Sequence, residues 1–343
     1  MSALTARRRG RSLITRLAVR EKGLERRILR GLEQVETRLQ ECAREADDPR
    51  LAAVVGHLIT AGGKRLRPLL TLLGAEFGDP RAPGVIEAAV LSELVHTASL
   101  HHDDVMDEAL TRHGVSSVNA RWGNTVAVRS GNWLLAKAAQ MSAGLTPEAV
   151  PLQADASERL VRGQVRELVG PAFDENHMSH YFDVVSDKSA SLISLSLRLG
   201  AIQAGAPARV CDALAVYGEH LGVAFQIADD LLDVTSSSAD LGKEQGKDLA
   251  VAVASLPVLL VLDGGRPEDE ELRTLLSDPA GLSGERHLRA LALLRRSKAM
   301  DRARVLMDER LARARSALAG ALPSGAPYEA LDALCDFVAN RTA

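Results

Sequence analysis

The 343-residue chain is poor in aromatic side chains and in cysteine. Tyr, Phe and Trp together make up 3% of it, and these residues favour strands, whereas the abundant Ala, Leu and Arg favour helices. The composition therefore predicts an all-α fold. The three cysteines, Cys42, Cys211 and Cys335, are far apart and form no CxxC pair. This spacing argues against a zinc site or a disulfide framework, and three lone thiols fit a reducing, cytoplasmic compartment.

The sequence also lacks a long hydrophobic run and a strong excess of either charge. No segment reaches 18 consecutive apolar residues, so no membrane-spanning helix is expected. The net charge of −3 gives no reason to expect a nucleic-acid partner. Residues 1–20 are an exception, a basic arm in which Arg7, Arg8, Arg9 and Arg11 stand within the first dozen residues. No apolar run follows these arginines, so a secretory signal is not expected. Such an arm can contact phosphates or anionic lipids, but a solvated, flexible tail is the commoner structure.

What the sequence does contain is a series of helical patterns separated by glycine and proline. Residues 21–44 carry apolar side chains at helical spacing, and long apolar helices are expected over 85–108 and 214–234. The stretch 264–284, rich in Gly, Pro and acids, is expected to be a surface excursion. With no linker between independent parts, the chain predicts one domain over 21–343, a bundle of ten or more helices. The other helices are expected at 127–144, 151–169, 189–204 and within 287–319.

Two clusters of three aspartates stand at the ends of two expected helices, each in the pattern DDxxD. Positions i and i+4 of a helix lie on nearly the same side, so the first and last aspartate of each cluster share a face. Concentrated carboxylates repel unless a cation intervenes, and Mg²⁺ binds carboxylate oxygens together with substrate phosphates. One such motif can arise by chance at a helix end, but two copies in apolar helices predict magnesium sites. The predicted ligands are Asp103, Asp104, Asp107, Asp229, Asp230 and Asp233.

Basic residues accompany both acid clusters. Lys64 and Arg67 stand one turn apart after a glycine pair, and a lysine point charge and an arginine fork are the usual groups that bind phosphate. Arg65, between them, is expected to be a solvated surface charge. Arg112 follows the first cluster and Lys243 the second. The pattern suits two diphosphates, one held through metal and the other held directly.

With these motifs, the chain resembles the trans-isoprenyl diphosphate (polyprenyl) synthase family. The resemblance implies an isoprenoid-synthase bundle around a central cavity, a homodimer, and a Mg²⁺-dependent transferase acting on isopentenyl diphosphate and an allylic diphosphate. It covers about residues 50–260. The matching motifs, in order, are GGKRLRP at 62–68, LVHTASLHHDDVMDEALTRHG at 94–114, VNARWGNTVAV at 118–128, KSASLISLSLRLGA at 188–201, FQIADDLLDV at 225–234 and LGKEQGKDL at 241–249.

Positions within these motifs assign roles to single residues. The resemblance implies that the isopentenyl diphosphate site falls on Lys64, Arg67 and His96. It implies that the six aspartates hold the allylic diphosphate through metal, with direct contacts from Arg112, Lys188 and Lys243. Ser189 and Gln226 match positions that line the developing cation. Lys188, Ser189 and Gln226 are therefore the expected catalytic residues.

Three positions depart from the family pattern. A second arginine usually follows the one matched by Arg112, but this chain has His113. The usual Gly-Asp pair after the first motif ends in Asn132, and a lysine that commonly reaches diphosphate is replaced by Val253. The loss of two cations weakens phosphate binding, by about 1–3 kcal/mol for each hydrogen-bonded charge.

Small residues before the first acid cluster bear on the length of the product. Short-chain members of the family commonly carry bulky aromatic groups at the level of Ala98 and Ser99. The HTASL sequence before the first acid cluster resembles that of long-chain members that make quinone side chains, so a product of about C30–C50 is expected. Peripheral membrane contact is expected when this apolar product is released. The alternatives are a short-chain farnesyl or geranylgeranyl synthase, a terpene cyclase-like variant, and a non-catalytic subunit of a heteromeric synthase.

Overall fold

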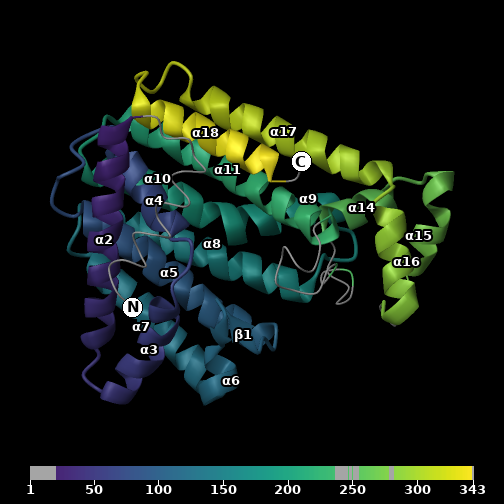
Figure 1. Ribbon diagram of the computed structural model, residues 1–343, viewed down its shortest axis with the longest axis horizontal. Helices are drawn as coiled ribbons and strands as arrows, with labels where there is room; N and C mark the ends of the chain where they lie inside the picture. The colour runs from purple at the N-terminus through teal and green to yellow at the C-terminus, as the bar shows by residue number, and fades with distance from the viewer. Residues whose placement is uncertain (1–20, 236–245, 247–248, 250–254, 278–281, 342–343) are drawn as a thin grey trace. The chain divides into compact units, whose positions relative to one another are not determined.

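The structure is a computed structural model that describes residues 21–235, 246, 249, 255–277 and 282–341. Helices dominate the described chain (Figure 1). The α-helices are α2 (Lys22–Arg44), α3 (Pro49–Ala61), α4 (Leu66–Ala75), α5 (Val85–Met106), α6 (Val118–Trp122), α7 (Asn124–Ser142), α8 (Ala149–Val169), α9 (His177–Val185), α10 (Ser191–Gln203), α11 (Ala208–Thr235), α14 (Leu256–Asp263), α15 (Glu270–Leu276), α16 (Gly284–Leu294), α17 (Lys298–Leu318) and α18 (Ala326–Asn340).

Other regular structure within the described residues is short. The strands β1 (Thr111–Arg112) and β2 (Val115–Ser116) form an antiparallel hairpin, η1 (Ser186–Ala190) is a π-helix, and η2 (Pro267–Asp269) is a 3₁₀ turn. The predictions of an all-α fold and of ten or more helices are confirmed. In the described part of the chain, no helix combines the length and the apolar character needed to cross a bilayer. The basic arm at 1–20 lies outside the described residues.

Contacts divide the chain into two compact units, each assembled from segments that are far apart in sequence. Unit 1 comprises Met1–Glu158, Leu192–Gly218 and Ala317–Leu334. Unit 2 comprises Arg159–Ser191, Glu219–Ser316 and Cys335–Ala343. Neither unit is a continuous stretch of sequence, and the single domain over 21–343 stays a prediction.

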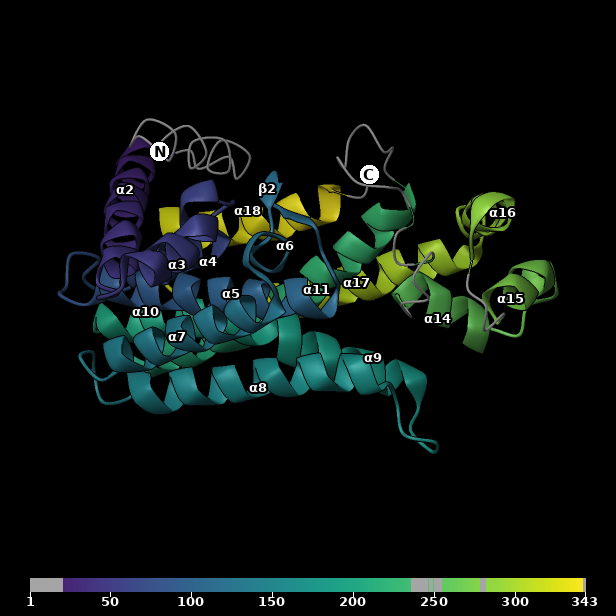
Figure 2. The same cartoon turned by 90° about the horizontal axis from the view of Figure 1, so that it is seen from below.

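Unit 1 is organised around α5, which is apolar on most of its circumference and largely buried. It packs against α2, α4 and α7, and α5 and α7 run side by side in Figure 2. A glycine also allows α4 and α10 to pack closely together. A Cβ atom on Gly200 would lie 1.9 Å from the carbonyl oxygen of Thr71, so only glycine fits there. This packing fixes α5, and with it the acid cluster at its end.

Unit 2 contains a helix that the sequence did not reveal. Residues 264–284 were expected to form a surface excursion, but α15 lies within them. Leu272 is buried, and α15 packs against α14 and α16, so tertiary contacts stabilise this seven-residue helix. Its acidic side chains lie in the first turn, where they interact favourably with the helix dipole. The prediction of a surface excursion is wrong for α15. A single buried leucine gives too weak a periodic pattern to predict a helix from the sequence.

Candidate active site

The acid cluster of unit 1 occupies the last turn of α5. Asp104 is fully buried, and its Oδ1 atom accepts hydrogen bonds from Arg112 of β1, with Nη2 at 2.6 Å and Nε at 2.8 Å. The amide of Asn119 donates to the backbone carbonyl of Asp104 at 2.9 Å. Asp103 is half-buried, and Asp107, the C-cap of the helix, is exposed. The middle acid is thus held by protein donors, whereas the outer two present a more open pair one turn apart.

Cationic groups from several segments converge on His96, in the middle of α5. The Arg67 Nη1 atom lies 3.1 Å from His96 Nε2. Burial lowers the pKa of His96 well below its usual value, and the positive charges of Arg67, His113, Arg65 and Arg112 lower it further. His96 is therefore neutral at neutral pH and accepts a hydrogen bond from the Arg67 guanidinium. After burial, the largest influences on His96 come from basic residues, and a positive field of this kind is suited to an anion.

Arg65 was expected to be a solvated charge, and this expectation is wrong. Its side chain is 12% exposed and forms ion pairs at 2.9 Å with both Glu36 and Glu93. It also donates to the backbone carbonyl of Ile59 at 2.7 Å. Arg65 has a left-handed backbone conformation, with φ at 52°, which turns its side chain inward from the loop between α3 and α4. The buried pairs anchor this loop, which carries Lys64, and the start of α4, which carries Arg67.

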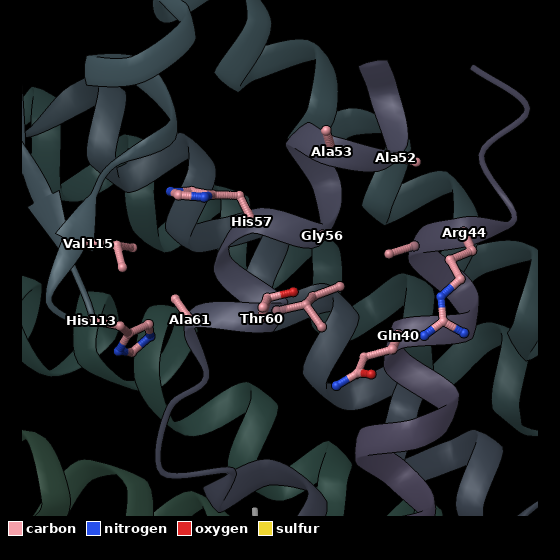
Figure 3. A pocket seen from close by; sticks show the side chains of 12 residues that line it. Gln40, Arg44, Ala52, Ala53, Gly56, His57, Thr60, Ala61, His113 and Val115 are labelled. Carbon is pink, nitrogen blue, oxygen red and sulfur yellow. The ribbon is translucent and has the colours of Figure 1, made fainter. Parts of the chain in front are cut away.

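His113 lies at the turn of the hairpin, beside the same loop. Its ring atoms lie 3.5 Å from where a Cβ atom on Gly63 would be, and its charge contributes to the low pKa of His96. The side chain also borders a cavity of about 670 Å³ (Figure 3). Gln40 and Arg44 of α2 lie on the opposite side of this cavity, with Thr60 of α3 between. His113 thus places an imidazole where the family pattern has an arginine, with a shorter reach.

The acid cluster of unit 2 lies near the end of α11, and its middle aspartate is buried. The Oδ2 atom of Asp230 accepts from the Tyr181 hydroxyl at 2.7 Å and from the Leu256 backbone N–H at 2.9 Å. Its Oδ1 atom accepts from the Gln226 amide at 3.1 Å. Burial raises the pKa of Asp230 to about 6, although these hydrogen bonds act in the opposite direction. Asp230 therefore links α9, α11 and the start of α14.

The outer aspartates of this cluster are more open. Asp229 and Asp233 are both half-buried. Asp229 accepts a hydrogen bond from Arg341 at 2.7 Å, and the backbone carbonyl of Asp233 accepts from the N–H of Gly246 at 3.0 Å. As in unit 1, the buried middle acid is engaged by the protein, and the outer two form the accessible pair.

The three expected catalytic residues lie in unit 2, two of them in the π-helix η1. The Ser189 hydroxyl donates to Gln226 Oε1 at 2.9 Å, and the Gln226 amide donates in turn to Asp230. Lys188 pairs with Glu167 of α8. Single π-turns inside helical segments are frequent at functional sites. Here the π-turn carries Ser189, which is linked through Gln226 to Asp230, and Lys188, which pairs with α8.

An arginine brace that the sequence did not predict holds this turn in place. Asp187, within η1, accepts from Arg162 Nε at 2.8 Å and from Arg159 Nε at 3.1 Å. Arg159 also pairs with Glu219 at 2.6 Å. Gly163 allows α8 to approach, because a Cβ atom there would lie 2.7 Å from the backbone nitrogen of Lys188. These partners come from distant segments, so no local pattern could have revealed them.

The structure brings the predicted residues together within each unit. In unit 1 the residues around α5 are Arg67, His96, Arg112 and the first three aspartates. In unit 2 they are Ser189, Gln226 and the second three aspartates. Lys64 is exposed in the loop before α4, and Asn132 is exposed on α7. Lys243 and Val253 lie outside the described residues.

Comparison with known proteins identifies the family to which these two clusters belong. The family model described as polyprenyl synthetase matches residues 48–291, which include both acid clusters. The chain belongs to the polyprenyl synthetase family. The resemblance drawn from the motifs is therefore confirmed.

Relatives of this chain include enzymes named for products of different lengths. The nonaprenyl diphosphate synthase of Mycobacterium tuberculosis is 41% identical over 312 residues, which cover 91% of this chain and 92% of that one. The geranylgeranyl pyrophosphate synthase of Corynebacterium glutamicum, solved with calcium and isoprenyl diphosphate, is 38% identical, with a TM-score of 0.84 over 94% of this chain and 98% of that one. A decaprenyl diphosphate synthase from Rhodobacter capsulatus is 31% identical, with a TM-score of 0.84 over 93% and 98%.

The donor set of this chain fits magnesium. Within the described residues, no group of three or more His, Cys, Asp or Glu side chains forms a metal site by itself. Mg²⁺ does not need such a cage, since it keeps several waters and binds one or two carboxylates together with substrate phosphates. Asp104 and Asp230 are the buried members of the six, so the four outer aspartates, which are more exposed, are favoured as direct ligands. Magnesium at all six stays a prediction.

Proposed function

We propose that the chain is a Mg²⁺-dependent trans-prenyltransferase that condenses isopentenyl diphosphate with an allylic diphosphate to make a long-chain polyprenyl diphosphate of about C30–C50. The observation that carries the proposal is the cationic cluster around neutral His96, on the same helix that ends in an acid cluster. One helix thus presents a direct anion site and, two turns on, carboxylates for a metal-held anion. The named products of two relatives, nonaprenyl and decaprenyl diphosphate, support the long chain.

The reaction breaks the allylic carbon–oxygen bond, forms a carbon–carbon bond to the isopentenyl double bond, and transfers one proton from the adduct to the released diphosphate. Bound Mg²⁺ would neutralise the charge that develops on that diphosphate. Arg67, oriented by its contact with His96, and Lys64 bind the isopentenyl diphosphate and hold its double bond in position. Arg112 and Lys188 bind the leaving group.

The paired side chains of Ser189 and Gln226 place oxygen atoms at the developing cation. The serine hydroxyl donates its proton to Gln226, so its lone pairs are directed away from that bond. The glutamine is fixed in turn by its hydrogen bond to Asp230. Fixed oxygen dipoles stabilise positive charge without the nucleophilic attack that mobile water would make.

Product analysis tests this function directly. Purified protein is incubated with Mg²⁺, isopentenyl diphosphate and primers of five, ten, fifteen and twenty carbons, and the products are sized. Products of about C30–C50 that need both substrates and disappear with a chelator are expected. Products of C15 or C20 indicate the short-chain alternative, a cyclic hydrocarbon made without isopentenyl diphosphate indicates a cyclase, and no product from any primer indicates a non-catalytic subunit.

Replacement of His113 by arginine is expected to lower the KM for isopentenyl diphosphate about tenfold. The reason is that an arginine in the same turn extends further toward the Lys64 and Arg67 site, and one hydrogen bond to a charged group is worth about 1.5–3 kcal/mol. Steady-state kinetics with each substrate varied in turn measure this change. Thr111→Arg adds a charge on the exposed side of the same hairpin and should leave this KM unchanged. An unaltered KM in His113→Arg indicates that this position does not contact the substrate.

We also propose a homodimer that covers an apolar stripe on the unit 2 portion of α8. Val161, Val165, Leu168 and Val169 share one helical face and are between 48% and 78% exposed. Contiguous exposed apolar side chains of this kind mark interaction sites, and a two-fold symmetric pair buries the same stripe on both copies.

Sedimentation velocity tests the dimer. The parent should sediment as a dimer, and Val165→Asp should shift it to a monomer, because the new charge would be buried without a partner. Val305→Asp, at a valine of 45% exposure on α17, is the matched control and should remain dimeric. The proposal is contradicted if the parent sediments as a monomer. It is also contradicted if the stripe binds lipid vesicles and does not bind a second copy of the chain. A cytoplasmic location is part of the same proposal and is supported by Cys42, Cys211 and Cys335, three buried cysteines that stand far apart in the sequence.

A further inference from the structure

Arg341, the residue that follows α18, lies against the second acid cluster. Its Nη2 atom lies 2.7 Å from Asp229 Oδ1, and its side chain is only 16% exposed. The guanidinium carbon lies 4.4 Å from the ring centroid of Phe225 and 6.0 Å from that of Phe337. Phe225 and Asp229 are one turn apart on α11, so the guanidinium lies along the helix face that carries the aspartates. A cation is therefore already positioned where the family motif places metal and diphosphate.

The hydrogen bonding of this guanidinium is incomplete. Its Nη1 atom is buried and has no hydrogen-bond partner within the described residues. A buried donor without an acceptor is destabilising, and the contacts with Asp229 and the two rings offset that loss. The arrangement is thus held by the charge of Asp229, and a second cation at the same carboxylate would repel the guanidinium and release it.

Asp229 differs in this respect from its neighbour. Asp230 is 3% exposed and accepts three hydrogen bonds from Tyr181, Leu256 and Gln226, so its carboxylate is committed to the fold. The side chain of Asp229 is 43% exposed and accepts from the side chain of Arg341. Of the two adjacent acids, Asp229 is therefore the one that can exchange a protein cation for a metal ion.

On the basis of the proposed function, we propose that Arg341 is a further diphosphate-binding residue. It balances the charge of Asp229 until a metal ion takes that carboxylate, and it then donates to the oxygens of the metal-held diphosphate. The planar guanidinium suits this role because it can donate two parallel hydrogen bonds to phosphate and can stack on Phe225 while it does so. A lysine provides the charge but neither the fork nor the stacking.

The test compares Arg341→Gln, Arg341→Lys and a control, Arg315→Gln, with the parent. Arg315 of α17 forms a 2.5 Å ion pair with Asp336 of α18, so its variant removes an arginine and a surface ion pair at the same helix without touching the acid cluster. Titration calorimetry on the full chain measures the binding of Mn²⁺ alone and of inorganic diphosphate in the presence of Mg²⁺. Kinetics measure the KM of each substrate, and melting temperatures report on folding.

Opposite changes in the two affinities are expected for Arg341→Gln. Mn²⁺ alone should bind several-fold more tightly, because Asp229 has lost its competing cation, whereas the affinity for magnesium diphosphate should fall about tenfold. The KM of the allylic substrate should rise more than that of isopentenyl diphosphate, and Arg341→Lys should recover part of the loss. The proposal is overturned if Arg341→Gln weakens the binding of Mn²⁺ and of magnesium diphosphate equally, or if Arg315→Gln causes the same change. Arg341 then has a structural role only.

The results also separate this inference from the proposed function. If diphosphate binding depends on Arg341 but no primer is elongated, the function is wrong and the binding role stands. If the parent makes long-chain products and Arg341→Gln binds magnesium diphosphate as the parent does, the function stands and the binding role is wrong.

Discussion

Asp103→Ala and Asp229→Ala are each expected to lower the condensation rate by at least about 10³-fold at saturating Mg²⁺. Each change removes an outer carboxylate of a DDxxD cluster, and metal stabilisation of a leaving diphosphate is worth several kcal/mol, at about 1.4 kcal/mol per factor of ten. Neither aspartate is fully buried, so the fold should survive. Product formation from radiolabelled isopentenyl diphosphate measures the rate, and thermal melting checks the fold.

The middle aspartates provide the informative contrast. Asp104 is fully buried against Arg112, and Asp230 accepts hydrogen bonds from three donors. Asp104→Ala and Asp230→Ala should therefore lower the melting temperature as well as the rate, because each leaves buried donors without acceptors. Asp336→Ala, at an exposed acid of α18, should change neither. Near-native turnover in Asp103→Ala or Asp229→Ala contradicts the metal assignment.

Sequence periodicity was sufficient to place the acid clusters at helix ends. The DDxxD spacing follows from 3.6 residues per turn, and the apolar runs before each cluster required buried helices, as α5 and α11 are. The same periodicity predicted α2 over 21–44 and α8 over 151–169, close to their observed bounds. These features depend on local spacing alone, which is why they could be predicted.

The partners of the acids could not be predicted, because they come from distant segments. Tyr181 reaches Asp230 from 49 residues away, and Arg341 reaches Asp229 from 112 residues away. Arg65 was expected to be solvated, yet its charge is balanced by Glu36 and Glu93 only after α2 and α5 have packed. The division of each cluster into one buried acid and two more exposed ones is likewise a tertiary property.

Ala98→Phe is expected to shorten the product from about C30–C50 to about C15–C20. We place the product tail along α5, from the acid cluster back past Ser99 and Ala98 and then Val95, since each turn advances about 5.4 Å. These side chains are small or apolar. Ser99 donates its hydroxyl to the His96 carbonyl of its own helix at 2.8 Å, so it has no need of a polar partner in the path. A phenyl ring just beneath the metal site would fill this path and stop elongation after the first additions.

The burial of Ala98 requires a control for overpacking. The residue is fully buried, so a phenylalanine there is expected to cost about 1–3 kcal/mol of stability whether or not it meets the tail. Ala303→Phe, at a fully buried alanine of α17, introduces the same strain away from α5 and should lower the melting temperature without changing product length.

Ser99→Phe, at a side chain that keeps 8% exposure, should shorten the product with less loss of stability. Chromatographic sizing of the products measures the outcome. A parent that stops at C15 or C20, or unchanged products in both phenylalanine variants of α5, would mean that the small residues serve helix packing and that the tail takes another path.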